Sequence, residues 1–111
     1  MKIVKQSNSG INLKGAEFTL TDADGKQIIC QISDENGIVF DGEIDYGTYT
    51  LTEIKAPSGY TVLADSIIIT VDGKGITVSE NDKVEVAEDG ITIIVKNDML
   101  YSLPSTGGSG I

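Results

Sequence analysis

The chain has 111 residues, a length that fits one domain with its own hydrophobic core, and it carries a formal net charge of −9. This acidic balance disfavours binding to nucleic acid and to anionic membrane surfaces, because both would repel the chain. Histidine is absent and Cys30 is the only cysteine, so the commonest general base, the commonest metal ligand and any internal disulfide are missing. We therefore expect no metal, no cofactor and no enzyme that acts on external substrates.

Short apolar runs recur along the chain, separated by Gly, Asn and Asp, and no stretch has the periodicity of an amphipathic helix. The apolar residues are mostly Ile and Val, whose β-branched side chains favour strands. In chain order, the predicted strands are 2–6, 16–21, 26–32, 37–40, 48–54, 66–71, 83–86 and 91–97. Turn signals between them include Asn36-Gly37 and Asp72-Gly73. Many short strands at this spacing predict an all-β sandwich.

Side-chain alternation directs three polar residues towards the predicted core, because alternate residues of a strand share a face. Glu53 is in phase with the apolar residues at alternate positions before it, and Asn97 is in phase with the apolar residues of the last predicted strand. Lys5 is in phase with Ile3, in a strand too short to decide the orientation alone. A buried unpaired charge is costly. Either each side chain reaches water from a strand end, or the three meet in the core.

Segments 13–20, 47–60 and 93–97 read LKGAEFTL, GTYTLTEIKAPSGY and IIVKN. They resemble the Cna B-type (collagen-adhesin B-type) domains of Gram-positive adhesins and pilins. The run Tyr-x-Leu-x-Glu-x-x-Ala-Pro-x-Gly-Tyr in the second segment is the most specific part. The resemblance implies that residues 1–98 form an immunoglobulin-like β-sandwich, of the reverse-Ig or prealbumin-like type, with about seven to nine strands.

The resemblance also implies a self-crosslinking reaction. In these domains a lysine on the first strand condenses with an asparagine, or sometimes an aspartate, on the last strand, and a glutamate assists. By this resemblance Lys5 is the nucleophile, Asn97 the electrophile and Glu53 the residue that transfers the proton. Lys2 is the alternative nucleophile, but it is out of phase with Ile3. Asp98 is the alternative acceptor, but it is out of phase with the apolar face that ends at Val95. The reaction happens once per molecule, so it is maturation and not turnover.

Residues 99–111 differ in composition and are predicted to form a flexible tail behind the domain. Five of them resemble the recognition signal of sortase: Leu103, Pro104, Ser105, Thr106 and Gly107. Sortase cleaves such a signal between the threonine and the glycine and joins the threonine carbonyl to an amine of the cell wall or of a pilin. The apolar span and basic end that complete the signal are missing after Ile111. We therefore expect the sequence to be a piece of a longer secreted chain.

Together these features predict a structural stalk or wall-proximal module of a cell-wall-anchored surface protein or pilin, secreted and covalently attached to the cell surface. The expected partners are sortase, then peptidoglycan or a neighbouring pilin subunit, and a host matrix ligand of the parent protein. The alternative is an adhesive module that itself contacts a host matrix protein or glycan. Only six aromatic residues are present, which disfavours an aromatic-rich contact patch.

Two weaker patterns have ordinary structural interpretations. Asp22-x-Asp24-Gly25 is interpreted as a β-turn, because the position where a calcium loop needs its bidentate glutamate is occupied by Ser33. Cys30 is in phase with two isoleucines of its strand, so we expect it to be buried as a small hydrophobic residue.

Overall fold

The computed structural model describes residues 1–100 and contains nine strands. In chain order they are β1 (Lys2–Ser7), β2 (Glu17–Thr21), β3 (Gln27–Ile32), β4 (Ile38–Asp41), β5 (Gly47–Lys55), β6 (Ile67–Asp72), β7 (Gly75–Val78), β8 (Val84–Val86) and β9 (Thr92–Asn97). Within this part of the chain, no helix has the length and apolar character needed to cross a membrane.

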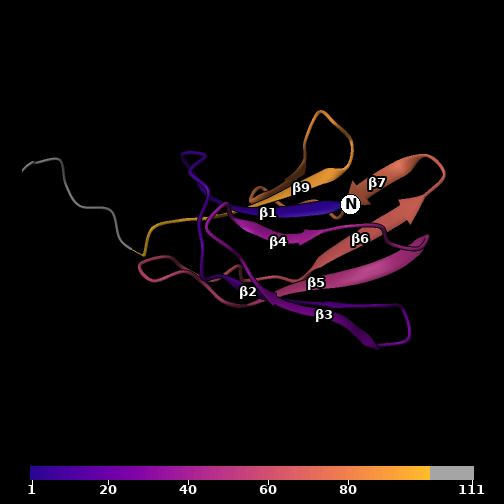
Figure 1. The fold of residues 1–111 in the computed structure, drawn as a ribbon, viewed down its shortest axis with the longest axis horizontal. Coiled ribbons are helices and arrows are strands. Elements are labelled where there is room, and N and C mark those ends of the chain that lie inside the picture. The colour runs from indigo at the N-terminus through magenta and orange to yellow at the C-terminus, as the bar shows by residue number, and fades with distance from the viewer. Residues whose placement is uncertain (101–111) are drawn as a thin grey trace, which may run out of the picture.

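The strands form two sheets that face each other, with the orders β4-β1-β9-β8 and β3-β2-β5-β6-β7 (Figure 1). One apolar cluster fills the space between them, with residues such as Ile3, Phe18, Leu51 and Ile93 almost completely buried. Because each strand turns alternate residues inward, both sheets contribute to the same core. The predicted all-β sandwich is confirmed.

The first and last strands lie side by side in the first sheet and run parallel, from Lys2 opposite Thr92 to Ser7 opposite Asn97. Parallel neighbours cannot be joined by a tight hairpin. Here the whole of the remaining domain forms the connection between them. The N-terminus therefore lies at one end of this strand pair and the end of β9 lies at the other (Figure 1).

All eight predicted strands exist, with ends that differ by a residue or two, but β7 was missed. This strand has four residues and pairs as a hairpin with β6, from Asp72 opposite Gly75 to Ile69 opposite Val78. The turn predicted at Asp72-Gly73 is present and joins β6 to β7. A turn of this kind between strands is itself evidence for a second strand, so the missed hairpin could have been predicted.

Cys30 is exposed, so the prediction that it is buried is wrong. The buried residue of this segment is Ile29, which pairs with the fully buried Leu20 of β2, whereas Ile28 is 45% and Ile32 60% exposed. The strand β3 lies at the edge of its sheet and carries apolar residues on both faces. Phase with apolar neighbours therefore could not identify the core-facing side.

The described chain continues past the last strand. Met99 forms an isolated bridge with Tyr60, and the amide of Leu100 donates to the carbonyl of Gly59 at 2.7 Å. These two residues, which the sequence assigns to the tail, lie against the loop that follows β5. The division of the chain after residue 98 stays a prediction, and the sorting motif at 103–107 lies outside the described residues.

Candidate functional site

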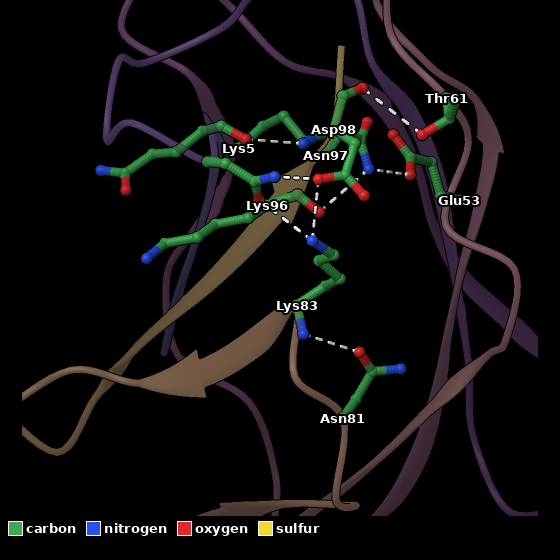
Figure 2. A network of polar contacts seen from close by, with 10 residues as sticks. Lys5, Glu53, Thr61, Asn81, Lys83, Lys96, Asn97 and Asp98 are labelled. Atoms are coloured by element: carbon green, nitrogen blue, oxygen red, sulfur yellow. Dashed lines mark hydrogen bonds and ion pairs between the residues drawn. The ribbon is translucent and has the colours of Figure 1, made fainter. Parts of the chain in front are cut away.

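Lys5, Glu53 and Asn97 are buried together between the two sheets, with exposed fractions of 0%, 5% and 2%. Each is on the core-facing side of its strand: Lys5 on β1, Glu53 on β5 and Asn97 on β9. Because β1 and β9 are neighbours and β5 lies in the opposite sheet, the fold brings all three side chains to one region of the core. Figure 2 shows the carboxyl group of Glu53 facing the carboxamide of Asn97.

Glu53 is held by two donors on the same oxygen. The carboxamide nitrogen of Asn97 donates to Oε1 at 2.9 Å, and the backbone amide of Leu63 donates to Oε1 at 2.7 Å. Among residues 1–100, two buried side-chain oxygens have no hydrogen-bond partner: Oε2 of Glu53 and Oδ1 of Asn97. Both are acceptors while Glu53 is ionised. A proton on Oε2 would turn it into a donor beside the unpaired amide oxygen.

Within residues 1–100, the hydrogen-bond partners of the Lys5 amine are two backbone carbonyls. Its Nζ donates to the backbone oxygen of Gln6 at 2.9 Å and to that of Val95 at 3.2 Å. Val95 lies two residues before Asn97 on the same face of β9. These bonds keep the amine in the core and close to the strand that carries Asn97.

Burial shifts both titrating groups towards their neutral forms. It lowers the pKa of Lys5 to about 8, although the negative charge of Glu53 acts in the opposite direction. Burial also raises the pKa of Glu53, against the hydrogen bonds from Asn97 and Leu63 and the charge of Lys5. Burial therefore moves Lys5 towards the neutral amine and Glu53 towards the carboxylic acid, the forms that amide formation needs.

The alternative residues do not lie in the core. Asp98 has a half-exposed side chain that forms an ion pair with Lys83 at 2.8 Å and accepts a hydrogen bond from Asn8 (Figure 2). Lys2 lies at the start of β1, on the face opposite to Ile3 and Lys5. Neither residue is as deeply buried as Lys5 and Asn97.

Two features of the site were not predicted from the sequence. The first is the donor at Leu63, which is a backbone amide; no side-chain pattern could identify it, since every residue except proline carries one. The second is a cleft of about 300 Å³ that borders Asn97 and is lined in part by Leu63, Lys83 and Asp98.

The chain is a β-sandwich of the prealbumin-like class. It has two facing sheets, and its first and last strands run parallel in one of them. Residues 1–84 match the family described as SpaA: Prealbumin-like fold domain, and the chain belongs to this family. The match includes Lys5 and Glu53 and ends before β9. No curated protein sequence matches the chain.

Several solved structures with a similar fold come from pilus proteins. The pilus 2b backbone protein of group B streptococcus is 26% identical with a TM-score of 0.70, over 94% of this chain and 42% of that one. The C-terminal fragment of the pilus adhesin SpaC from Lactobacillus rhamnosus GG is 33% identical with a TM-score of 0.65, over 93% and 45%. BcpA, the major pilin subunit of Bacillus cereus, is 25% identical with a TM-score of 0.61, over 87% and 27%. This chain thus spans less than half the length of each.

Proposed function

We propose that this chain is a structural module of a cell-wall-anchored pilin or surface protein, and that an isopeptide bond between Lys5 and Asn97 stabilises it with the help of Glu53. The observation that carries the proposal is the joint burial of these three side chains with two unpaired oxygens. Such a cluster is costly unless it reacts or is neutralised. Similarity to a pilus backbone protein and a pilus adhesin supports the structural role.

The reaction balances with the groups present. The neutral amine of Lys5 attacks the carboxamide carbon of Asn97, while the proton of Glu53 polarises the carbonyl oxygen. Glu53 then takes a proton from the attacking nitrogen and gives one to the departing nitrogen, so it ends in its starting state. The bond from carbon to Nδ2 breaks, ammonia leaves, and one secondary amide links the two strands. The rate depends mainly on proximity, which the folded core provides.

The parallel arrangement of β1 and β9 gives this bond a mechanical role. A pull on the two ends of the domain acts on the start of β1 and on the end of β9, at opposite ends of this parallel strand pair (Figure 1). An amide between Lys5 and Asn97 would pass the load directly from one strand to the other. The residues between them, and with them most of the hydrophobic core, would carry no tension.

Peptide mapping tests the bond and its partners. Protein digested under denaturing conditions is expected to yield a branched peptide in which Lys5 is joined to Asn97, with one ammonia lost. Fragmentation of this peptide distinguishes these residues from Lys2 and Asp98. Recovery of every peptide in its linear form would overturn the proposed bond.

The rate of bond formation is expected to be bell-shaped in pH. The amine of Lys5, with its pKa lowered to about 8, becomes increasingly protonated as the pH falls, so the rate decreases on the acid side. The acid form of Glu53 persists to a higher pH than in an exposed glutamate, but it is lost as the pH rises further. The optimum should lie between the two pKa values, which belong to the coupled pair. Ammonia loss followed by mass after cell-free synthesis at a series of pH values measures the profile. A rate that keeps increasing far above pH 8 would contradict an acid role for Glu53.

The anchoring part of the proposal rests on the motif at 103–107, which follows the last described residue, Leu100, after two positions. Incubation with a sortase and an amine nucleophile is expected to remove residues 107–111 and to attach the amine to Thr106. Thr106→Ala should abolish this exchange, whereas Ser102→Ala, just outside the motif, should leave it unchanged. An intact chain after prolonged incubation with several sortases would contradict the anchoring role.

A further inference from the structure

Two turns of this chain have the same construction, at residues 22–26 and 34–38. In each, Oδ1 of the leading aspartate accepts the amides two and four residues further on, all at 2.9 Å. In each, the glycine at the fourth position donates back to the carbonyl of that aspartate. The two glycines have similar left-handed backbone conformations, with φ of +82° at Gly25 and +77° at Gly37. The turns therefore place the same local demands on their glycines.

The surroundings of the two glycines differ. A Cβ atom added at Gly25 would meet nothing within 4 Å, whereas at Gly37 it would lie 2.6 Å from the backbone oxygen of Lys5. It would also lie 3.1 Å from Cβ of Asn12 and 3.3 Å from the amide of Leu13. Gly37 is buried and Gly25 is exposed. The turn 34–38 is thus packed directly on the backbone of Lys5.

The backbone of Lys5 is fixed at this contact. Its amide donates to the carbonyl of Gly37 at 2.7 Å, and its carbonyl accepts from the amide of Leu13 at 2.9 Å. The pairing of β1 with β4 shifts register between Ile3 and Val4, immediately before Lys5. Irregularities of this kind bend a strand and re-aim the side chains beside them. The direction in which the Lys5 side chain points from β1 therefore depends on the turn 34–38.

We propose that Gly37 is a positioning residue for Lys5, and that its missing side chain lets the turn 34–38 hold the Lys5 backbone where the amine reaches Asn97. This inference rests on the proposed crosslink. A Cβ at Gly37 must push the carbonyl of Lys5 away, because a separation of 2.6 Å is too short for any real contact. The long side chain amplifies a small rotation at its base. Misplacement of a reacting atom by about 1 Å can slow a reaction on the order of 100-fold.

The test compares Gly37→Ala with Gly25→Ala, which adds the same methyl group and the same backbone strain in open space. Ammonia loss is followed by intact mass after cell-free synthesis, and the folded fraction by circular dichroism. Per folded molecule, Gly37→Ala should crosslink roughly 10- to 100-fold more slowly than wild type, and Gly25→Ala at the wild-type rate. The pH optimum should not move in Gly37→Ala. A variant that merely loosened the core would hydrate Lys5 and Glu53, move both pKa values back towards their ordinary values and so change the shape of the profile.

A second pair of variants tests the same proposal if Gly37→Ala does not fold. Asp34→Ala removes the acceptor that shapes the turn without adding bulk, and Asp22→Ala does the same in the matched turn. Asp34→Ala should slow crosslinking several-fold and Asp22→Ala should not. Equal rates within each pair, in a wild-type background that crosslinks, would overturn the positioning role alone. A wild-type protein that loses no ammonia would overturn the crosslink and this inference with it.

Discussion

Replacement of Glu53 by Gln is expected to slow formation of the Lys5–Asn97 bond by about 10²–10⁴-fold while leaving the fold intact. The glutamine oxygen can still accept from Asn97 and from the amide of Leu63, the two donors that hold Glu53. What the variant lacks is the acidic proton. The carbonyl of Asn97 is then less polarised, and no group carries a proton from the attacking nitrogen to the leaving one. Intact mass at fixed times after synthesis measures the effect.

The matched control is Glu17→Gln, the same change on β2 outside the buried cluster. It should crosslink at the wild-type rate, which would show that loss of one negative charge is not enough to slow the reaction. If Glu53→Gln completed the crosslink as fast as wild type, Glu53 would have no role in proton transfer. Its burial would then be a structural feature of the core.

Replacement of Lys5 by Met is expected to lower the free energy of unfolding by about 4–5 kcal/mol. The proposed bond would enclose the chain from residue 5 to residue 97 and would thereby remove much of the conformational entropy of the unfolded state. At about 4–8 °C per kcal/mol for a domain of this size, the melting temperature should fall by roughly 16–40 °C. Methionine keeps a similar volume without a charge, so the loss reports the missing bond and not a buried amine.

Lys2→Met is the control for this second experiment, because Lys2 lies on the same strand but faces away from the core. It should keep the crosslink and melt close to the wild type. Unfolding followed by circular dichroism, in heat and in guanidinium chloride, gives both comparisons. A Lys5→Met protein as stable as the wild type would mean that no bond encloses the domain.

The clearest predictions from the sequence came from the longer strands. On β5 and β9, several apolar residues alternate with polar ones, so the inward direction of Glu53 and Asn97 could be predicted from the pattern alone. The structure gives the same burial for Lys5, whose short strand offered only Ile3 as a guide. Prediction failed at Cys30, because an edge strand with apolar residues on both faces carries no phase information.

Contacts that the backbone makes between distant parts of the chain could not be predicted from the sequence. The amide of Leu63 holds Glu53, yet nothing in the side chain of Leu63 indicates this. The turns at 22–26 and 34–38 look equivalent in sequence and have the same hydrogen bonds, but only the second packs on Lys5. Local turn chemistry determines the shape of each turn, and the fold determines which of them touches the site.

Intact mass under denaturing conditions is the most direct test of the covalent bond between Lys5 and Asn97. The purified protein is expected to weigh one ammonia less than its sequence requires. Lys5→Ala, Glu53→Ala and Asn97→Ala should each show the full mass of their own sequence. A wild-type mass equal to the sequence value would contradict the crosslink, and the stability of the sandwich would then have to come from its core alone.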